Sequence, residues 1–101
     1  MKIHLYLYDY ELTFTATWNY IYFPNVGEQL YVFPFLPPQD KTDLEGIMCG
    51  DVATDVVLSP FQERNSNISL LKVLETHPCL IEMKTWKYFD DELICSFCLK
   101  M

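Results

Sequence analysis

Hydrophobic and polar residues alternate along the first third of the chain. The segment 2–8 places aliphatic side chains at every second position, and the segment 12–23 sets apolar or aromatic side chains opposite a row of threonines. A period of two is typical of a strand that has one face buried and one face in water. We therefore expect two strands here, joined into a hairpin by a turn at 9–11.

Two further strands are predicted in the middle of the chain, at 29–35 and 51–58. Prolines at the end of the first and after the second limit both, because proline cannot donate a hydrogen bond to a sheet ladder. Between them, Thr42 and Glu45 have the spacing of a helix capping box. Glycines follow closely, so we expect about one helical turn there and no more.

The last third is predicted to be a polar loop at 62–67, an ambiguous segment at 68–75, and a hairpin. The ambiguous segment fits either a short helix or a strand, and we favour the strand. The hairpin consists of strands at 79–88 and 92–100, with Asp90-Asp91 as its turn.

About six short strands with at most a short helical turn predict an all-β, mainly antiparallel fold: a small β-barrel or a two-sheet sandwich. Pairing of the first strand with the last would close the sheet and protect its edges. The 101 residues have room for one core, so we expect a single domain over 1–101.

The charge balance disfavours two classes of partner. Fourteen Asp and Glu face seven Lys and Arg, which gives a net charge of −7. Proteins that bind nucleic acid or anionic membranes directly need clustered basic residues, and Arg64 is the only arginine. An acidic surface suits solubility or a basic protein partner. Because no secretory signal or membrane-spanning run stands out, we expect a cytoplasmic protein.

Residues with catalytic or metal-binding chemistry do not form a recognisable motif. Cys95 and Cys98 have C-x-x-C spacing, but on a strand residues three apart point to opposite faces and cannot share one ion. Cys49 and Cys79 each stand alone, so all four cysteines are expected to be reduced and buried. The sequence therefore predicts no catalytic residue, no cofactor and no metal.

Aromatic residues exceed what one small core needs, since both faces of the segments 2–8 and 29–35 are apolar. Either the tyrosines lie on the barrel with their hydroxyls in water, or an aromatic patch forms an interface. The candidate interface residues are Tyr6, Tyr8, Tyr31, Phe33 and Phe35.

These observations predict a non-enzymatic domain that binds a protein partner or forms a homo-oligomer. Two alternatives are an acidic inhibitor or immunity-type protein that blocks a basic partner surface, and a small-ligand-binding barrel.

Overall fold

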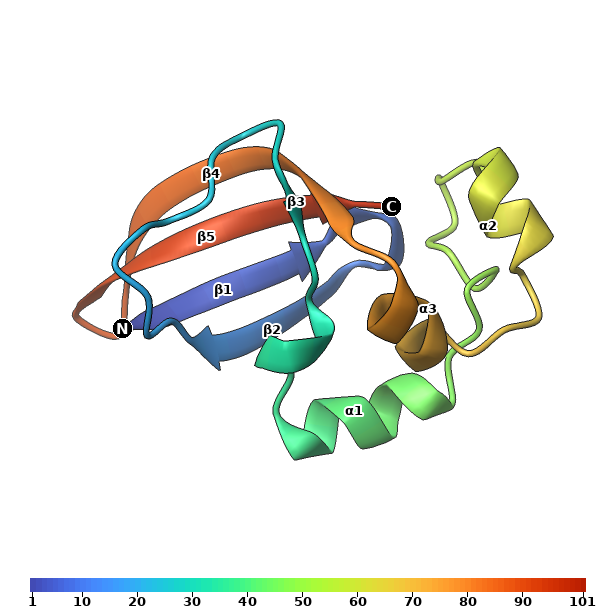
Figure 1. The fold of residues 1–101 in the computed structure, drawn as a ribbon, viewed down its shortest axis with the longest axis horizontal. Helices are drawn as coiled ribbons and strands as arrows, with labels where there is room; N and C mark the ends of the chain where they lie inside the picture. The colour runs from blue at the N-terminus through green and yellow to red at the C-terminus, as the bar shows by residue number, and fades with distance from the viewer.

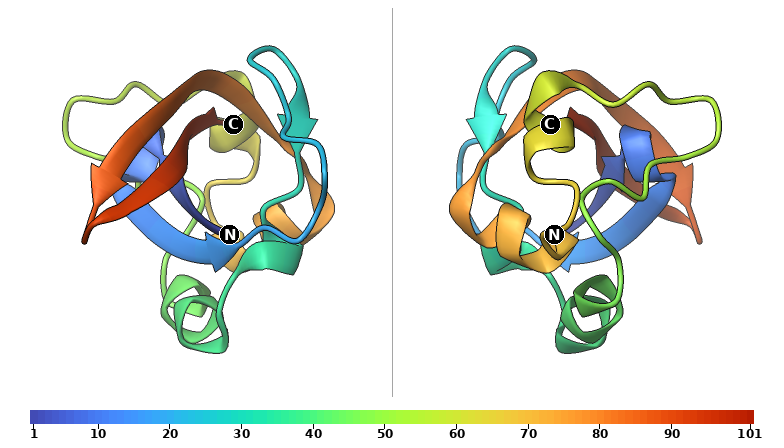
Figure 2. Two further views of the ribbon diagram at one scale, coloured as in Figure 1. Left: turned by 90° about the vertical axis from the view of Figure 1, so that its left-hand side faces the viewer. Right: turned by 90° about the vertical axis from the view of Figure 1, so that its right-hand side faces the viewer.

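The computed structural model of the chain describes residues 1–101, and its centre is one five-stranded sheet (Figure 1). The strands are β1 (Lys2–Leu7), β2 (Leu12–Thr17), β3 (Gln29–Leu30), β4 (Cys79–Phe89) and β5 (Glu92–Lys100). Their order is β2-β1-β5-β4-β3, in which β1 and β5 are parallel and the other neighbours antiparallel. The sheet curls into a half-barrel, visible end-on in Figure 2.

Five short helices connect the strands. They are the 3-10 helices η1 (Tyr8–Tyr10) and η2 (Phe33–Phe35) and the α-helices α1 (Pro38–Glu45), α2 (Pro60–Arg64) and α3 (Leu70–Thr76). Serine side chains begin two of them: Ser59 caps α2 and Ser69 caps α3, each accepting a backbone N–H three residues on. Figure 1 shows α2 and α3 beyond the end of the sheet at which β1 finishes, and α1 below the sheet, next to α3.

None of these helices has the length and apolar character needed to cross a membrane.

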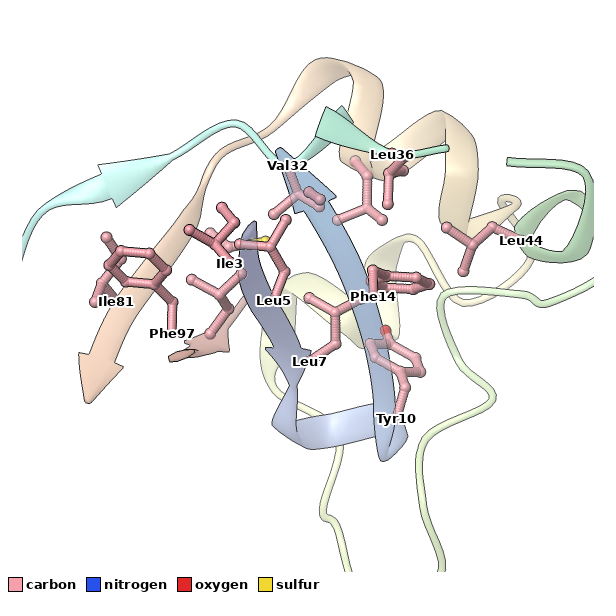
Figure 3. Close-up of a cluster of buried hydrophobic side chains, with 14 of the residues drawn as sticks. Ile3, Leu5, Leu7, Tyr10, Phe14, Val32, Leu36, Leu44, Ile81 and Phe97 are labelled. Atoms are coloured by element: carbon pink, nitrogen blue, oxygen red, sulfur yellow. The ribbon is translucent and has the colours of Figure 1, made fainter. Parts of the chain in front are cut away.

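The core lies on the inner face of the sheet. Ile3, Leu5 and Leu7 of β1 are almost fully buried, and Figure 3 shows them among side chains from the connecting segments. In the parallel pairing they lie level with three buried residues of β5, which are Cys95, Phe97 and Leu99. Leucines of α1 and α3 complete the cluster from outside the sheet: Leu44, Leu70 and Leu74.

Both predicted hairpins are confirmed. β1 and β2 pair antiparallel through η1, and β4 and β5 pair around Asp90-Asp91. The two aspartates have φ of 51° and 62°, the left-handed conformation that a tight hairpin turn requires. The first and last strands do pair, but in parallel, and they lie in the middle of the sheet, so their pairing does not close it.

The expected closed barrel or two-sheet sandwich is replaced by a single mixed half-barrel of five strands. The segment 51–58 is not a strand, because its backbone bonds elsewhere: the Ala53 N–H donates to the Asp9 carbonyl at 2.8 Å. The strand expected at 29–35 ends at Leu30, and Pro34 lies within η2. The strand expected at 12–23 ends at Thr17, which pairs with the first residue of β1.

The expectation of at most one helical turn is also wrong. The segment 68–75 forms α3 instead of a strand, because its apolar residues at positions i, i+3 and i+4, Leu70, Val73 and Leu74, all face the core. The polar segment 62–67 is partly α2, and α1 begins well before the predicted capping box.

Candidate functional site

The two ends of the sheet expose different chemistry. At the hairpin end, the inner face of β4 and β5 continues beyond β1, since the parallel pairing begins at Ile3 opposite Cys95. Trp86 pairs with the buried Cys95, which places Trp86 on the inner face. Tyr88, two residues on, lies on the same face and pairs with Leu93. No strand covers these side chains, and Tyr88 is 80% exposed.

The segment after β2 adds aromatic residues beside this hairpin. Trp18 is buried, and its ring stacks on those of Phe23 and Phe35, with centroids 5.8 and 5.1 Å apart. Phe23 in turn contacts Trp86 edge-on at 5.3 Å. The Trp18 indole N–H donates to the carbonyl of Tyr22 at 3.0 Å and so fixes the backbone there.

On the backbone fixed in this way, three consecutive large hydrophobic residues face water: Tyr20, Ile21 and Tyr22. Ile21 and Tyr22 are 90% and 84% exposed. We call the exposed residues of these two segments, which meet through the Phe23–Trp86 contact, the aromatic surface: Tyr20, Ile21, Tyr22, Trp86, Tyr88 and Leu93. It is joined to the core through the stacked rings of Trp18 and Phe23.

Acidic residues border the aromatic surface at the hairpin turn. Asp90, Asp91 and Glu92 follow Tyr88 closely in the chain and are exposed. Glu92 has a partner, Lys2, at 3.7 Å, but both side chains are more than half exposed, so the pair adds little stability. Lys84 is engaged by the Asn25 side-chain oxygen at 3.2 Å. The turn therefore leaves two carboxylates free beside the aromatic rings.

The outer edge of β4 is open next to the same surface. β3 pairs with Cys79 and Leu80 only, and Ile81 exchanges backbone hydrogen bonds with the segment before β3. From residue 82 to residue 89, the backbone of β4 bonds to β5 alone. A free strand edge can accept another chain by main-chain hydrogen bonding.

At the other end of the sheet lies a surface cavity of about 480 Å³. Its walls come from the end of β1, η1, the loop before α2, α2 itself and the end of β5. The tyrosines, the charged residues and the glutamine of the wall are Tyr6, Tyr8, Asp9, Glu11, Asp55, Gln62 and Lys100.

Asp9 is the most unusual residue of this cavity. Its side chain is almost fully buried, with 4% of the residue exposed, although it is an acid. One carboxylate oxygen, Oδ2, accepts from the Gln62 amide at 2.9 Å, and the other, Oδ1, has no partner. Gln62 is held in place because its own oxygen accepts the Ser59 N–H at 2.9 Å in the α2 capping box.

No cation neutralises Asp9. The nearest basic residue of the cavity wall, Lys100, places its ammonium 5.6 Å from the centre of the Tyr8 ring and forms no ion pair. Glu11 and Asp55, both exposed, add two more carboxylates to the rim.

The charge of Asp9 acts on its surroundings. Burial raises the pKa of the Cys79 thiol to about 12, and the negative charge of Asp9 adds to this shift. Burial is also the main cause of the raised pKa of the Tyr10 hydroxyl, followed by its hydrogen bond to Cys49, with a smaller effect of Asp9. Burial is the main cause of both shifts, and the nearby negative charge acts in the same direction.

The structure divides the five predicted interface residues between several places. Tyr6 and Tyr8 line the cavity, with their rings edge-to-face at 6.4 Å. Phe35 stacks under the aromatic surface, against Trp18. Phe33 lies beneath the Lys41 ammonium at 4.3 Å, and Tyr31, two residues before Phe33, is exposed. The five therefore do not form one patch.

Sequence reasoning missed most of the aromatic surface and the buried acid. For Trp86 and Tyr88 the sequence does contain a signal. The alternation of the strand predicted at 79–88 continues up to the turn at Asp90-Asp91, and the shorter strand at 2–8 cannot cover the whole length of that hairpin. For Asp9 there was none: it was interpreted as a turn residue, and its partner Gln62 lies 53 positions away.

The cysteines have the placement that a strand predicts. Cys95 faces the core, while Cys98 pairs with Tyr6 on the outer face. Cys98 is only half-buried, unlike the other three. No three His, Cys, Asp or Glu side chains converge on one point where an ion could be held.

Comparisons of the chain with protein-family models, with curated proteins and with solved structures found no match.

Proposed function

We propose that this chain is a non-enzymatic protein-binding module that contacts its partner through the aromatic surface. One observation carries the proposal: the large apolar side chains of Ile21, Tyr22 and Tyr88 are each at least 80% exposed. Large exposed apolar groups are unfavourable in water, and a protein interface removes them from it.

The rigidity of this surface favours tight contact. The stacked rings of Trp18, Phe23 and Phe35 connect the segment 18–23 to the core, and the Trp18 indole bonds the Tyr22 carbonyl, so the backbone there has little freedom to lose on binding. Aromatic residues held in this way are enriched among the side chains that dominate binding energy. The open edge of β4 adds main-chain donors and acceptors beside them.

The charges favour a basic partner over a second copy of the chain. Two copies meeting at the aromatic surface would bring their acidic turns, Asp90 and Asp91, close together, and each chain carries −7. Like charges facing each other oppose association. We therefore propose a partner with an apolar patch bordered by Lys or Arg. An enzyme with a basic surface, blocked by this chain, is one case of such a partner.

Site-specific photocrosslinking tests the proposal in cells of the native host. A benzophenone amino acid replaces Tyr88 in one version of the chain and Ile68 in a control version. Ile68 is apolar and exposed but lies just before α3, away from the aromatic surface. The proposal expects a discrete crosslinked protein from position 88 and none from position 68.

The recovered partner is then purified and titrated with the wild-type chain and two variants. Tyr22→Ser is expected to weaken binding tenfold or more. A tenfold change corresponds to about 1.4 kcal/mol of binding free energy, which is the order of loss expected when an important interface side chain is truncated. Ile68→Ser is expected to leave the affinity unchanged, and added salt should weaken the wild-type complex. Equal crosslinking at both positions, or a crosslinked adduct that is a dimer of this chain, would contradict the proposal.

A further inference from the structure

We infer that the cavity beside Asp9 is a second binding site, which takes a guanidinium or alkylammonium group. It lies at the end of the sheet opposite the aromatic surface: β5 runs from Glu92, beside the exposed rings, to Lys100, in the cavity wall (Figure 1). The two sites are therefore separate, and each can be tested without the other.

Asp9 carries the inference. A buried carboxylate needs hydrogen-bond donors or a cation, because its charged oxygens have left water. Here Gln62 supplies one donor to Oδ2, and Oδ1 has none. Asp9 is one of the residues that line the cavity, but Oδ1 itself is buried, so a donor that enters from that side reaches it by displacing part of the wall. The Gln62 amide is fixed by Ser59, so it cannot turn to serve both oxygens at once.

The rest of the wall also favours a positive charge. The Tyr6 and Tyr8 rings line the cavity, and aromatic faces attract cations. The Lys100 ammonium over Tyr8 shows that this ring accepts one. Glu11 and Asp55 make the rim acidic, so the four charged side chains of the wall sum to −2 from three acids and one lysine.

The size and spacing favour an organic cation over a metal ion. The cavity measures about 480 Å³, within the range of roughly 300–1,000 Å³ that small-molecule sites occupy. Asp9, Glu11 and Asp55 do not converge on one point, as ligands of a metal must. A flat guanidinium or a primary ammonium on an alkyl chain can reach Asp9 while its stem lies along the tyrosines.

Such a group can come from a free metabolite or from an Arg or Lys side chain of a protein. Titrations of the folded chain followed by ¹H–¹⁵N NMR separate these sources. The probes are propylguanidinium, its neutral counterpart propylurea, and a blocked peptide with one central arginine. We expect saturable shifts at the amides of Tyr8, Asp9, Glu11 and Ala53 with the guanidinium, and none with the urea.

Binding by propylguanidinium but not the peptide would assign the site to a free small molecule. Binding by both, or by the peptide alone, would assign it to a protein side chain. The absence of saturable shifts with either cation at concentrations up to about 20 mM, or equal shifts with propylurea, would overturn the inference.

Variants test the assignment to Asp9. Asp9→Asn keeps an oxygen for Gln62 and should lower the affinity at least tenfold, about the loss expected when one partner of a buried charge pair is removed. Lys100→Met, which removes the competing cation, should raise the affinity about two- to fivefold. Glu75→Gln, an exposed change on α3, is the matched control and should have no effect. Should Asp9→Asn not fold, an unchanged affinity in Lys100→Met and in Glu11→Gln would still overturn the inference.

Discussion

Replacing Asp9 by asparagine is expected to make the folded chain more stable at pH 7. The carboxylate is buried, receives one hydrogen bond from Gln62 and leaves Oδ1 without a partner. An asparagine oxygen can accept the same bond from Gln62 at 2.9 Å, while the negative charge is gone.

The size of the effect follows from two opposing contributions. A charged acceptor left unpaired in the interior costs about 1–3 kcal/mol or more, and the substitution removes that penalty. The new asparagine amide is itself a buried donor without a partner, which costs about 1 kcal/mol. We expect a net gain of up to about 2 kcal/mol in the free energy of unfolding. For a domain of this size, each kcal/mol corresponds to a rise in Tm of about 4–8 °C.

Urea denaturation followed by tryptophan fluorescence measures this difference, with Asp55→Asn as the control. Asp55 is an exposed acid of the same cavity, so its substitution should change stability by less than about 0.5 kcal/mol. If the folded Asp9→Asn variant had a free energy of unfolding lower by about 1 kcal/mol or more, the reasoning would be refuted. That result would show that the charge of Asp9 stabilises the packing of α2 against the sheet.

A double-mutant cycle with Gln62 separates the charge from the hydrogen bond. Gln62→Leu removes the only donor to the carboxylate, and hydrogen bonds to charged groups are worth about 1.5–3 kcal/mol. The same substitution in the Asp9→Asn background should cost less by about 1 kcal/mol, since the acceptor there is neutral. Equal costs in both backgrounds would mean that Gln62 acts only as the cap of α2.

Three further predictions concern stability and are checked by denaturation. Tyr10→Phe should lower the free energy of unfolding by about 1–3 kcal/mol, because it removes the buried 2.5 Å hydrogen bond to the Cys49 carbonyl. Burial lowers the pKa of His4 from 6.5, so the unfolded chain binds a proton first as the pH falls. Stability should therefore drop from pH 6.5 downward toward the folded pKa, and less so in His4→Phe. Gly50→Ala should destabilise by about 1–3 kcal/mol, because its Cβ would lie 2.8 Å from that of Ser66 and 3.1 Å from the Ser66 backbone.

Local alternation was enough to predict the strands that form hairpins. In β1 and β2 the polar and apolar residues alternate strictly, and the partner strand follows within a few residues, so neighbouring sequence determines the pairing. The turn at Asp90-Asp91 is local in the same sense, because aspartate tolerates positive φ better than most residues.

Tertiary contacts decided the segments that sequence reasoning assigned wrongly. The apolar pattern of 51–58 resembles a strand, yet its backbone is held by η1 through the Ala53–Asp9 bond. α3 is only seven residues long, too short for its period to dominate the pattern, and Ser69 at its start was the better signal. The parallel pairing of β1 with β5 joins the two ends of the sequence, which no local pattern can reveal.

The candidate sites were predicted only in part for the same reason. The excess of aromatic residues was visible, but not which of them would remain uncovered. The cavity depends on η1 and α2 meeting, 53 residues apart, and on the Ser59 cap that orients Gln62. Neither the Gln62–Asp9 hydrogen bond nor the orientation of Gln62 by Ser59 produces a periodic pattern of residues from which it could be predicted.

The unequal lengths of the strands explain why the aromatic surface exists. β1 has six residues and β5 has nine, and their pairing begins at Ile3 opposite Cys95. The first three residues of β5 therefore extend beyond that pairing by about 10 Å, at roughly 3.3 Å per residue. Because no strand or helix packs against the inner face of this part of the hairpin, polar residues on both of its faces would favour solubility. Its inner face carries Leu93 instead, opposite Tyr88 of β4, and both are exposed. The fold leaves these apolar side chains in water, and the proposed partner, which would cover them, accounts for their presence at this position.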